Sequence, residues 1–158
     1  MSLLDVRIID LPPMRVASAT AFSSSPETEA WKKLETWASA RGLLNQPGHR
    51  IFGFDNPPPT TGSPNYGYEF WITVSSEVQP EGEIKIKEFK GGRYAVAHCK
   101  VNDPWQDIPG TWQKLVNWMQ GSKYHQGRHQ WLEEHLYPLE KMDGSQPFSL
   151  DLYLPISE

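Results

Sequence analysis

The protein has 158 residues, of which 38% are hydrophobic and 22% are charged, a composition that supports one domain with a hydrophobic core. Its net charge of -4 argues against a nucleic-acid-binding surface, because phosphate recognition requires clustered Lys and Arg. No apolar run approaches membrane-spanning length, no signal-peptide pattern is present and Cys99 is the single cysteine, so we expect a cytoplasmic protein that neither binds membranes nor forms an intrachain disulfide.

The N-terminal part of the chain changes from strand-like to helical spacing. Residues 6–11 and 15–22 are strand-like runs separated by Pro12-Pro13-Met14, and we expect them to pair as a hairpin. A helix over 27–41 follows, because a hydroxyl, a proline and acids precede apolar residues at helical spacing, which continue until Gly42. This part therefore predicts two strands and then a helix.

The stretch 65–74 predicts the central strand of the first half. It follows a short strand over 50–55 and a loop over 56–64 that contains four prolines. Its period of two places Glu69 and Trp71 on the face opposite a row of large apolar side chains. A solvated face has little reason to hold an indole beside a carboxylate, so we infer a pocket there. The alternative is an ordinary exposed Glu69 with Trp71 packed against a loop.

The second half repeats the alternation of strands and a helix. Its runs of alternating apolar residues predict strands, and its apolar residues at helical spacing predict helices. The expected elements are strands over 84–89 and 93–99 joined as a hairpin, a loop over 102–109, a helix that ends at Gly121, a shorter helix over 129–139 and a closing strand over 148–156.

An internal repeat relates the two halves. Residues 15–17 match residues 93–95 at an offset of 78, and Glu69 matches Asp151 at an offset of 82. The two acids should therefore take equivalent places, each on the face away from the aliphatic row. Because halves of about 80 residues are marginal alone, we expect them to share one core around an approximate two-fold axis, with a groove at that axis. The expected single domain, 1–158, then consists of repeats over about 1–78 and 79–158.

Several short motifs occur in a fixed order over nearly the whole chain. They are residues 52–57, Tyr68 with Glu69, residues 90–97, the helix with Trp112, Leu115 and Trp118, and residues 150–156. In this order they resemble the GyrI-like small-molecule-binding family, which also occurs as the effector-binding half of some AraC-type and MerR-type transcription regulators and as the Rob C-terminal domain.

The resemblance implies an α+β fold with strand-strand-helix-strand-strand halves. These would form one antiparallel sheet structure that carries helices and holds ligands in a central aromatic groove around an acidic residue. Glu69 is the residue that the resemblance assigns as this acid. The segment 132–135 departs from the family, because His135 stands where the family often has tyrosine after an aromatic and two acids.

Three functions fit this resemblance. The first is a binding module for hydrophobic, cationic or polycyclic small molecules, because aromatic faces attract cations and an acid supplies the counter-ion. The second is a hydrolase of reactive electrophilic compounds, in which burial raises the pKa of Glu69 so that it acts as a general base, while Tyr68, Tyr94 or Tyr137 stabilises or protonates a leaving group. The third is a protein-interaction module of the gyrase-inhibitor type, with an unknown partner. The candidate ligand-binding residues are Glu69, Trp71, Tyr68, Trp105, Tyr137, Tyr153 and Asp151.

Other conspicuous residues have structural interpretations. His125, His129, His135 and Glu133 are of types that ligate zinc, but Gly127 and polar surroundings favour solvated histidines, so we expect no metal and no cofactor. Trp31, Trp37, Trp112 and Trp118 lie at core spacing. We interpret Cys99 as a small strand residue. We expect a solvated strand face that carries Lys85, Lys87 and Lys90.

Overall fold

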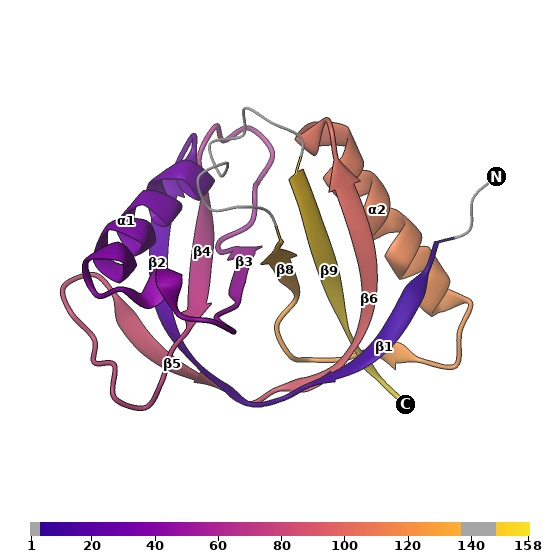
Figure 1. Ribbon diagram of the computed structural model, residues 1–158. Coiled ribbons are helices and arrows are strands. Elements are labelled where there is room, and N and C mark those ends of the chain that lie inside the picture. The colour runs from indigo at the N-terminus through magenta and orange to yellow at the C-terminus, as the bar shows by residue number, and fades with distance from the viewer. Residues whose placement is uncertain (1–3, 137–147) are drawn as a thin grey trace. The chain divides into compact units, whose positions relative to one another are not determined.

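The computed structural model describes residues 4–136 and 148–158, and the chain divides into two compact units (Figure 1). Unit 1 comprises residues 1–12 and 91–158, and unit 2 comprises residues 13–90. Each unit has an antiparallel sheet with one long helix, which is the α+β class that the sequence predicts. None of the helices in the described residues is long and apolar enough to cross a membrane.

Unit 2 carries helix α1 on one face of its sheet (Figure 1). The edge of the Trp31 ring on α1 packs against Phe70, with the ring centroids 5.5 Å apart. Gly42 follows the helix in the left-handed conformation, with φ at 68°, as its position in the sequence predicts. In sheet order the elements are β3 (Ile51–Asp55), β4 (Tyr66–Thr73), β2 (Met14–Ser23) and β5 (Lys85–Phe89), with α1 (Pro26–Ala40) and the 3-10 helix η1 (Leu43–Asn45).

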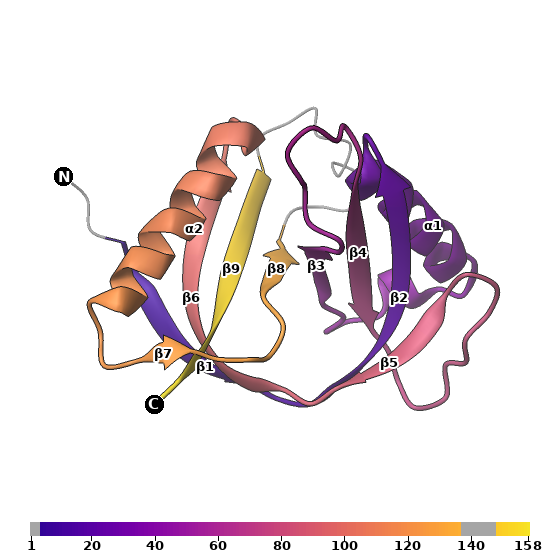
Figure 2. The ribbon, with the colours of Figure 1, turned by 180° about the vertical axis from the view of Figure 1, so that it is seen from behind.

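Unit 1 repeats this arrangement with helix α2 on its sheet (Figure 2). Leu115 and Met119 of α2 pack against alternate apolar residues of two neighbouring strands, and Trp112 and Trp118 lie partly buried at the margin of this core. In sheet order the elements are β1 (Val6–Leu11), β6 (Gly92–Val101), β9 (Phe148–Ser157) and β8 (Leu132–His135), with α2 (Pro104–Gln120) and the short strand β7 (His125–Gln126), which pairs with β9.

Neither of the two expected hairpins forms. β1 pairs with β6, and β2 pairs with β4 and β5, so the strands that follow each other in sequence belong to different units. Pro12 and Pro13 join the first two strands, and proline favours extended backbone over a tight reversal when another proline follows it. The boundaries of the compact units therefore differ from those of the expected sequence repeats.

Two helix predictions in the second half are wrong. Helix α2 begins at Pro104 rather than after Pro109, because the Asp103 carboxylate caps it by accepting the amide of Trp105 at 3.1 Å. Pro109 lies inside the helix, close to its N-terminal end. In residues 129–136, the described part of the helix expected over 129–139, strand β8 forms instead and gains backbone hydrogen bonds by pairing with β9. Residues 137–139 lie outside the described residues.

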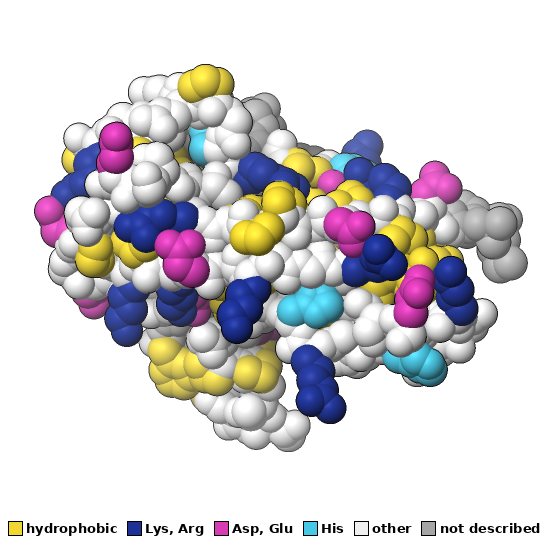
Figure 3. Space-filling model, turned by 90° about the horizontal axis from the view of Figure 1, so that it is seen from below, with side chains coloured by type: hydrophobic (Ala, Val, Ile, Leu, Met, Phe, Trp, Pro, Cys, Tyr) yellow, Lys and Arg dark blue, Asp and Glu magenta, His cyan; other side chains and the backbone are white. Residues whose placement is uncertain are grey.

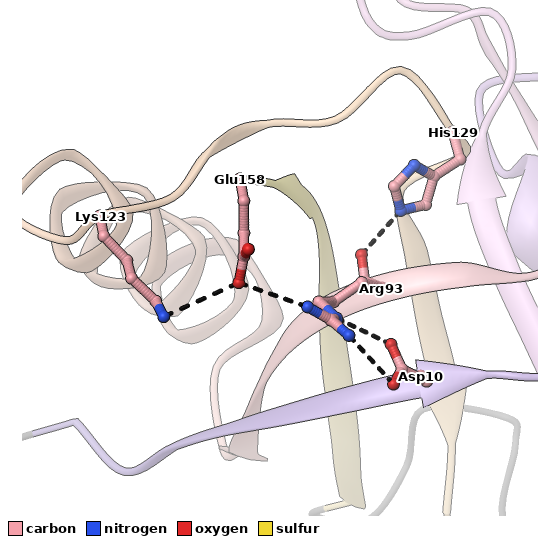
Figure 4. Close-up of polar contacts among 5 residues, drawn as sticks. All are labelled: Asp10, Arg93, Lys123, His129 and Glu158. Carbon is pink, nitrogen blue, oxygen red and sulfur yellow. Dashed lines mark hydrogen bonds and ion pairs between the residues drawn. The ribbon is translucent and has the colours of Figure 1, made fainter.

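The outer strand of unit 1 is held to β6 by side chains as well as by the backbone (Figure 4). The Arg93 guanidinium donates to both carboxylate oxygens of Asp10, at 2.9 and 3.4 Å, and these bonds lower the pKa of Asp10. His129 donates from Nε2 to the Arg93 carbonyl at 2.7 Å. A Cβ atom at Gly92 or Gly127 would overlap the His129 ring, so this histidine is packed in place rather than freely solvated.

Candidate functional site

Glu69 lies on β4, on the sheet face opposite α1, with only 1% of its surface exposed. The neighbouring residue Phe70 faces α1, and successive side chains of a strand point to opposite faces. We call Glu69 and its hydrogen-bond donors the Glu69 cluster. The donors to Oε2 are Trp71 Nε1 at 2.6 Å, Ser18 Oγ at 2.7 Å and Lys87 Nζ at 2.7 Å, and the donor to Oε1 is Asn56 Nδ2 at 3.0 Å.

The Glu69 carboxyl is held in its ionised form. Burial alone would raise its pKa, but the hydrogen bonds from Lys87, Ser18, Trp71 and Asn56 together outweigh burial and lower the pKa below its ordinary value of 4.5. The expectation that burial would raise this pKa towards that of a general base is therefore wrong. The cluster provides a buried negative charge at neutral pH, and the lowered pKa makes this carboxylate a weaker base than an ordinary glutamate.

Aromatic rings surround the indole that bonds to this acid. Trp71 is 6% exposed, and its ring contacts Phe54 edge-on at a centroid distance of 5.0 Å and Phe89 at 5.5 Å. Phe54 lies directly opposite Glu69 in the register of β3 and β4. On this face the structure places a buried carboxylate beside aromatic rings, and the pocket inferred there from the sequence stays a prediction.

Lys87 is the cationic member of the cluster. Its side chain is 42% exposed, whereas that of Glu69 is 1% exposed, so the ion pair links a solvent-accessible ammonium group to a buried carboxylate. Lys87 lies on β5, beside β2, and its side chain reaches Glu69 on β4. The interpretation of Lys87 as part of a solvated strand face is therefore wrong.

Unit 1 has its own acidic cluster around Asp151, which we call the Asp151 cluster. Asp151 pairs with His98 in the sheet register, as Glu69 pairs with Thr20, and these positions are related by the repeat offsets of 78 and 82. The Asp151 carboxylate accepts from Arg7 Nη2 at 2.9 Å and lies 3.0 Å from His98 Nδ1. Beside it, the Tyr153 hydroxyl donates to Glu134 Oε1 at 2.7 Å. Each acid thus lies in the same place in its own unit.

Among the remaining predicted site residues, the three that the structure describes do not join the Glu69 cluster. Tyr68 lies on the opposite face of β4, where it packs on Phe70 at 4.9 Å and covers Gly53. Trp105 is 81% exposed in the first turn of α2. Tyr94 is buried in unit 1 and donates to the Gln130 carbonyl at 2.5 Å, and burial raises the pKa of its hydroxyl well above the ordinary value of 10.0. Tyr137 lies outside the described residues.

The histidines considered as metal ligands are dispersed. His125 lies on β7, His129 packs against glycines, and burial lowers the pKa of His135 on β8 to about 3. Within residues 4–136 and 148–158, no group of three or more His, Cys, Asp or Glu side chains is arranged to hold a metal ion. Cys99 is buried, and burial raises the pKa of its thiol.

Three members of the Glu69 cluster are absent from the predicted site residues: Ser18, Asn56 and Lys87. Lys87 alternates with apolar side chains in a charged strand, and this pattern alone does not distinguish an ion-paired lysine from a solvated one. Ser18 is a small polar residue between two alanines in a strand-like run, and this position was the available signal that it could be buried.

A separate surface hollow of about 750 Å³ lies between α1 and residues 81–84 of unit 2. Four of the charged residues that line it form ion pairs with each other, Arg41 with Glu81 and Lys33 with Glu83. On the molecular face drawn in Figure 3, Lys and Arg side chains are interspersed with acidic and neutral groups. That face therefore lacks the concentrated positive charge that phosphate binding requires.

Comparison with known proteins identifies one family. The model of the GyrI-like small molecule binding domain matches residues 4–157. A search of curated proteins found no significant match. The match to the family model covers nearly the whole chain and both acidic clusters.

Solved structures show the same fold at low sequence identity. The EcmrR C-terminal domain aligns with a TM-score of 0.71 and 15% identity over 99% of both chains, and the chain spans 58% of EcmrR in its complex with DNA. A hydrolase from Listeria innocua aligns with a TM-score of 0.66 and 11% identity over 99% of this chain and 94% of that one. SAV2435 bound to tetraphenylphosphonium aligns with a TM-score of 0.58 and 9% identity over 98% and 94%.

Proposed function

The chain belongs to the GyrI-like small molecule binding domain family, and on that premise we propose that unit 2 binds lipophilic organic cations at the Glu69 cluster. The observation that carries this proposal is the ionised, 1% exposed carboxylate of Glu69 beside the ring of Trp71. A carboxylate supplies the counter-charge and aromatic rings supply apolar contact. A cation over an aromatic face gains about 0.5 to 2 kcal/mol.

Stability alone gives little reason to keep such a charge. Taking a carboxylate out of water carries a desolvation penalty that its attraction to a cation often fails to exceed, and well-packed apolar residues frequently stabilise a fold as well or better. The Glu69 and Lys87 pair therefore favours a role in recognition over a role in folding.

The proposal also draws support from one structural relative. SAV2435 is described in complex with tetraphenylphosphonium, which is a lipophilic cation with four aromatic rings. At 9% identity this likeness concerns the fold alone, but it identifies a suitable probe. The general-base alternative receives no support from the chain itself, because the pKa of Glu69 is lowered and that of Tyr94 is raised.

We expect the Glu69→Gln variant to bind tetraphenylphosphonium at least about tenfold more weakly than the wild type, because the cation loses its counter-ion and a tenfold change in affinity corresponds to about 1.4 kcal/mol. Glutamine keeps the size of the side chain and leaves Lys87 as an unpaired positive charge that repels the ligand. Isothermal titration calorimetry at neutral pH measures the affinity.

Glu88→Gln is the matched control for this experiment. It makes the same charge change on β5, one residue from Lys87, but at an exposed acid that pairs with Arg15. Its affinity should match that of the wild type. If both substitutions weakened tetraphenylphosphonium binding equally, the effect would come from the net charge of the protein alone. Unchanged binding in Glu69→Gln would exclude Glu69 as the residue that pairs with the cation.

A further inference from the structure

We propose that Lys87 is a tethered cation that occupies the cation position at Glu69, so that a cationic ligand must displace its ammonium group in order to bind. This inference rests on the proposed function and adds a regulation of the same site by the chain's own side chain. The Lys87 Nζ atom lies 2.7 Å from Oε2 of Glu69, which is the distance of a charge-assisted hydrogen bond. The acid is therefore already neutralised when no ligand is bound.

The donors to Glu69 differ in how easily they could leave. Ser18 and Trp71 are buried, and each is held by short bonds to Oε2 from the same sheet. Lys87 is the one charged donor, and its side chain is 42% exposed. It extends from β5, the outermost described strand of the unit 2 sheet, so that its ammonium can move into water without disturbing the strand pairing.

The chemistry of lysine suits such an exchange. Its ammonium is a strongly hydrated point charge on a flexible stem of four carbons, and release restores its rotamer freedom. A departing Lys87 would leave a negative charge and the apolar edge formed by Phe89 and Trp71. The remaining neutral donors would still hold the Glu69 carboxylate in place.

This exchange defines which ligands the site selects. A neutral molecule cannot replace the charge of Lys87, so displacement would leave Glu69 buried and uncompensated. A small hydrated cation would match the charge without gaining contact with the aromatic rings. A monovalent cation with large apolar groups supplies both, and we infer that this is the class of ligand for which the site is built.

The Asp151 cluster lacks this single displaceable cation. Asp151 accepts from Arg7 and also lies within an ion-pair distance of His98, so release of one partner leaves the other in place. Arginine also holds carboxylates with a rigid planar group rather than a point charge. We therefore assign the exchange to Glu69 of unit 2 alone.

The first test compares tetraphenylphosphonium binding to the wild type, Lys87→Gln and Lys85→Gln by isothermal titration calorimetry. Lys85 is exposed on the same strand and the same face, two residues from Lys87, and it is not among the hydrogen-bond donors of Glu69, so it controls for net charge. We expect Lys87→Gln to bind about tenfold more tightly, because the competing charge-assisted bond is gone. Lys85→Gln should stay within about twofold of the wild type, because exposed charges are screened.

The second test follows Lys87 in the wild-type protein. The rate of acetylation of its amine, measured by mass spectrometry, should rise when tetraphenylphosphonium is added, while that of Lys85 should not change. This readout requires no variant, so it holds if Lys87→Gln fails to fold. The exchange would be overturned, and the proposed function left intact, by the following combination of results. Glu69→Gln weakens tetraphenylphosphonium binding, but Lys87→Gln does not bind it more tightly and the ligand does not speed the acetylation of Lys87. Absence of binding to the wild type and to Lys87→Gln would overturn both.

Discussion

The Gly67→Ala variant should lose about 2 to 3 kcal/mol of unfolding free energy, at the upper end of the effect of overpacking a well-packed position. A Cβ atom at Gly67 would overlap the main-chain carbonyl of Asn56. This carbonyl cannot move alone, because the Asn56 amide donates to Gly67 at 2.9 Å and the Gly67 amide donates to Pro57 at 2.8 Å. Chemical denaturation at neutral pH measures the loss.

The same substitution should also reach the candidate site. Asn56 donates to Oε1 of Glu69, so its displacement removes one of the bonds that hold the carboxylate. Gly110→Ala is the control, since Gly110 lies in α2 with open space around its Cβ position. Alanine in a helix is favoured over glycine by about 0.5 to 1 kcal/mol, so this variant should be slightly more stable than the wild type. Equal stability of Gly67→Ala and the wild type would contradict the packing described around Asn56.

The Glu69→Ala variant should be destabilised by about 2 to 6 kcal/mol, because two buried donors lose their acceptor at a cost of about 1 to 3 kcal/mol each. The indole of Trp71 and the hydroxyl of Ser18 would lose their acceptor together with Lys87. Glu88→Ala on the same sheet provides the comparison, since its exposed pair with Arg15 contributes about 1 kcal/mol or less. A loss no larger than that of Glu88→Ala would show that the buried acid is not satisfied by these contacts.

The pH dependence of stability follows from the same acid. The folded protein binds the Glu69 proton more weakly than the unfolded chain, because the folded pKa lies below the ordinary value of 4.5. Stabilisation by Glu69 is therefore fully present above that value and is lost as the pH falls through the lower folded pKa. The decline in stability below pH 4.5 should be shallower in Glu69→Gln than in the wild type. Parallel declines in denaturation experiments between neutral and acidic pH would contradict this assignment.

Local patterns predicted the elements whose stability is local. Period-two alternation identified β4 and β9, and helical spacing with a terminal glycine identified α1. The choice of strand partners depends on contacts that are distant in sequence. The pattern of β1 and β2 was therefore sufficient to recognise strands but insufficient to exclude a hairpin between them.

The candidate site divides in the same way. Glu69 and Trp71 could be paired from the sequence because residues two apart in a strand share a face. Ser18, Asn56 and Lys87 lie 51, 13 and 18 residues from Glu69, and only the strand order brings them to its carboxylate. The direction of the Glu69 pKa was missed for this reason. Burial can be expected from a sequence, but the donors that outweigh it cannot.

Glu69 is, in this account, a buried and ionised carboxylate that pairs either with the ammonium group of Lys87 or with a cationic ligand. The most direct test of this claim is a titration of the Glu69 carboxyl carbon by NMR, with and without saturating tetraphenylphosphonium. The account predicts a pKa below 4.5 and shifts of both the Glu69 carboxyl and the Lys87 amine signals when the cation is added. A Glu69 pKa above its ordinary value, or signals that do not respond to the cation, would contradict it.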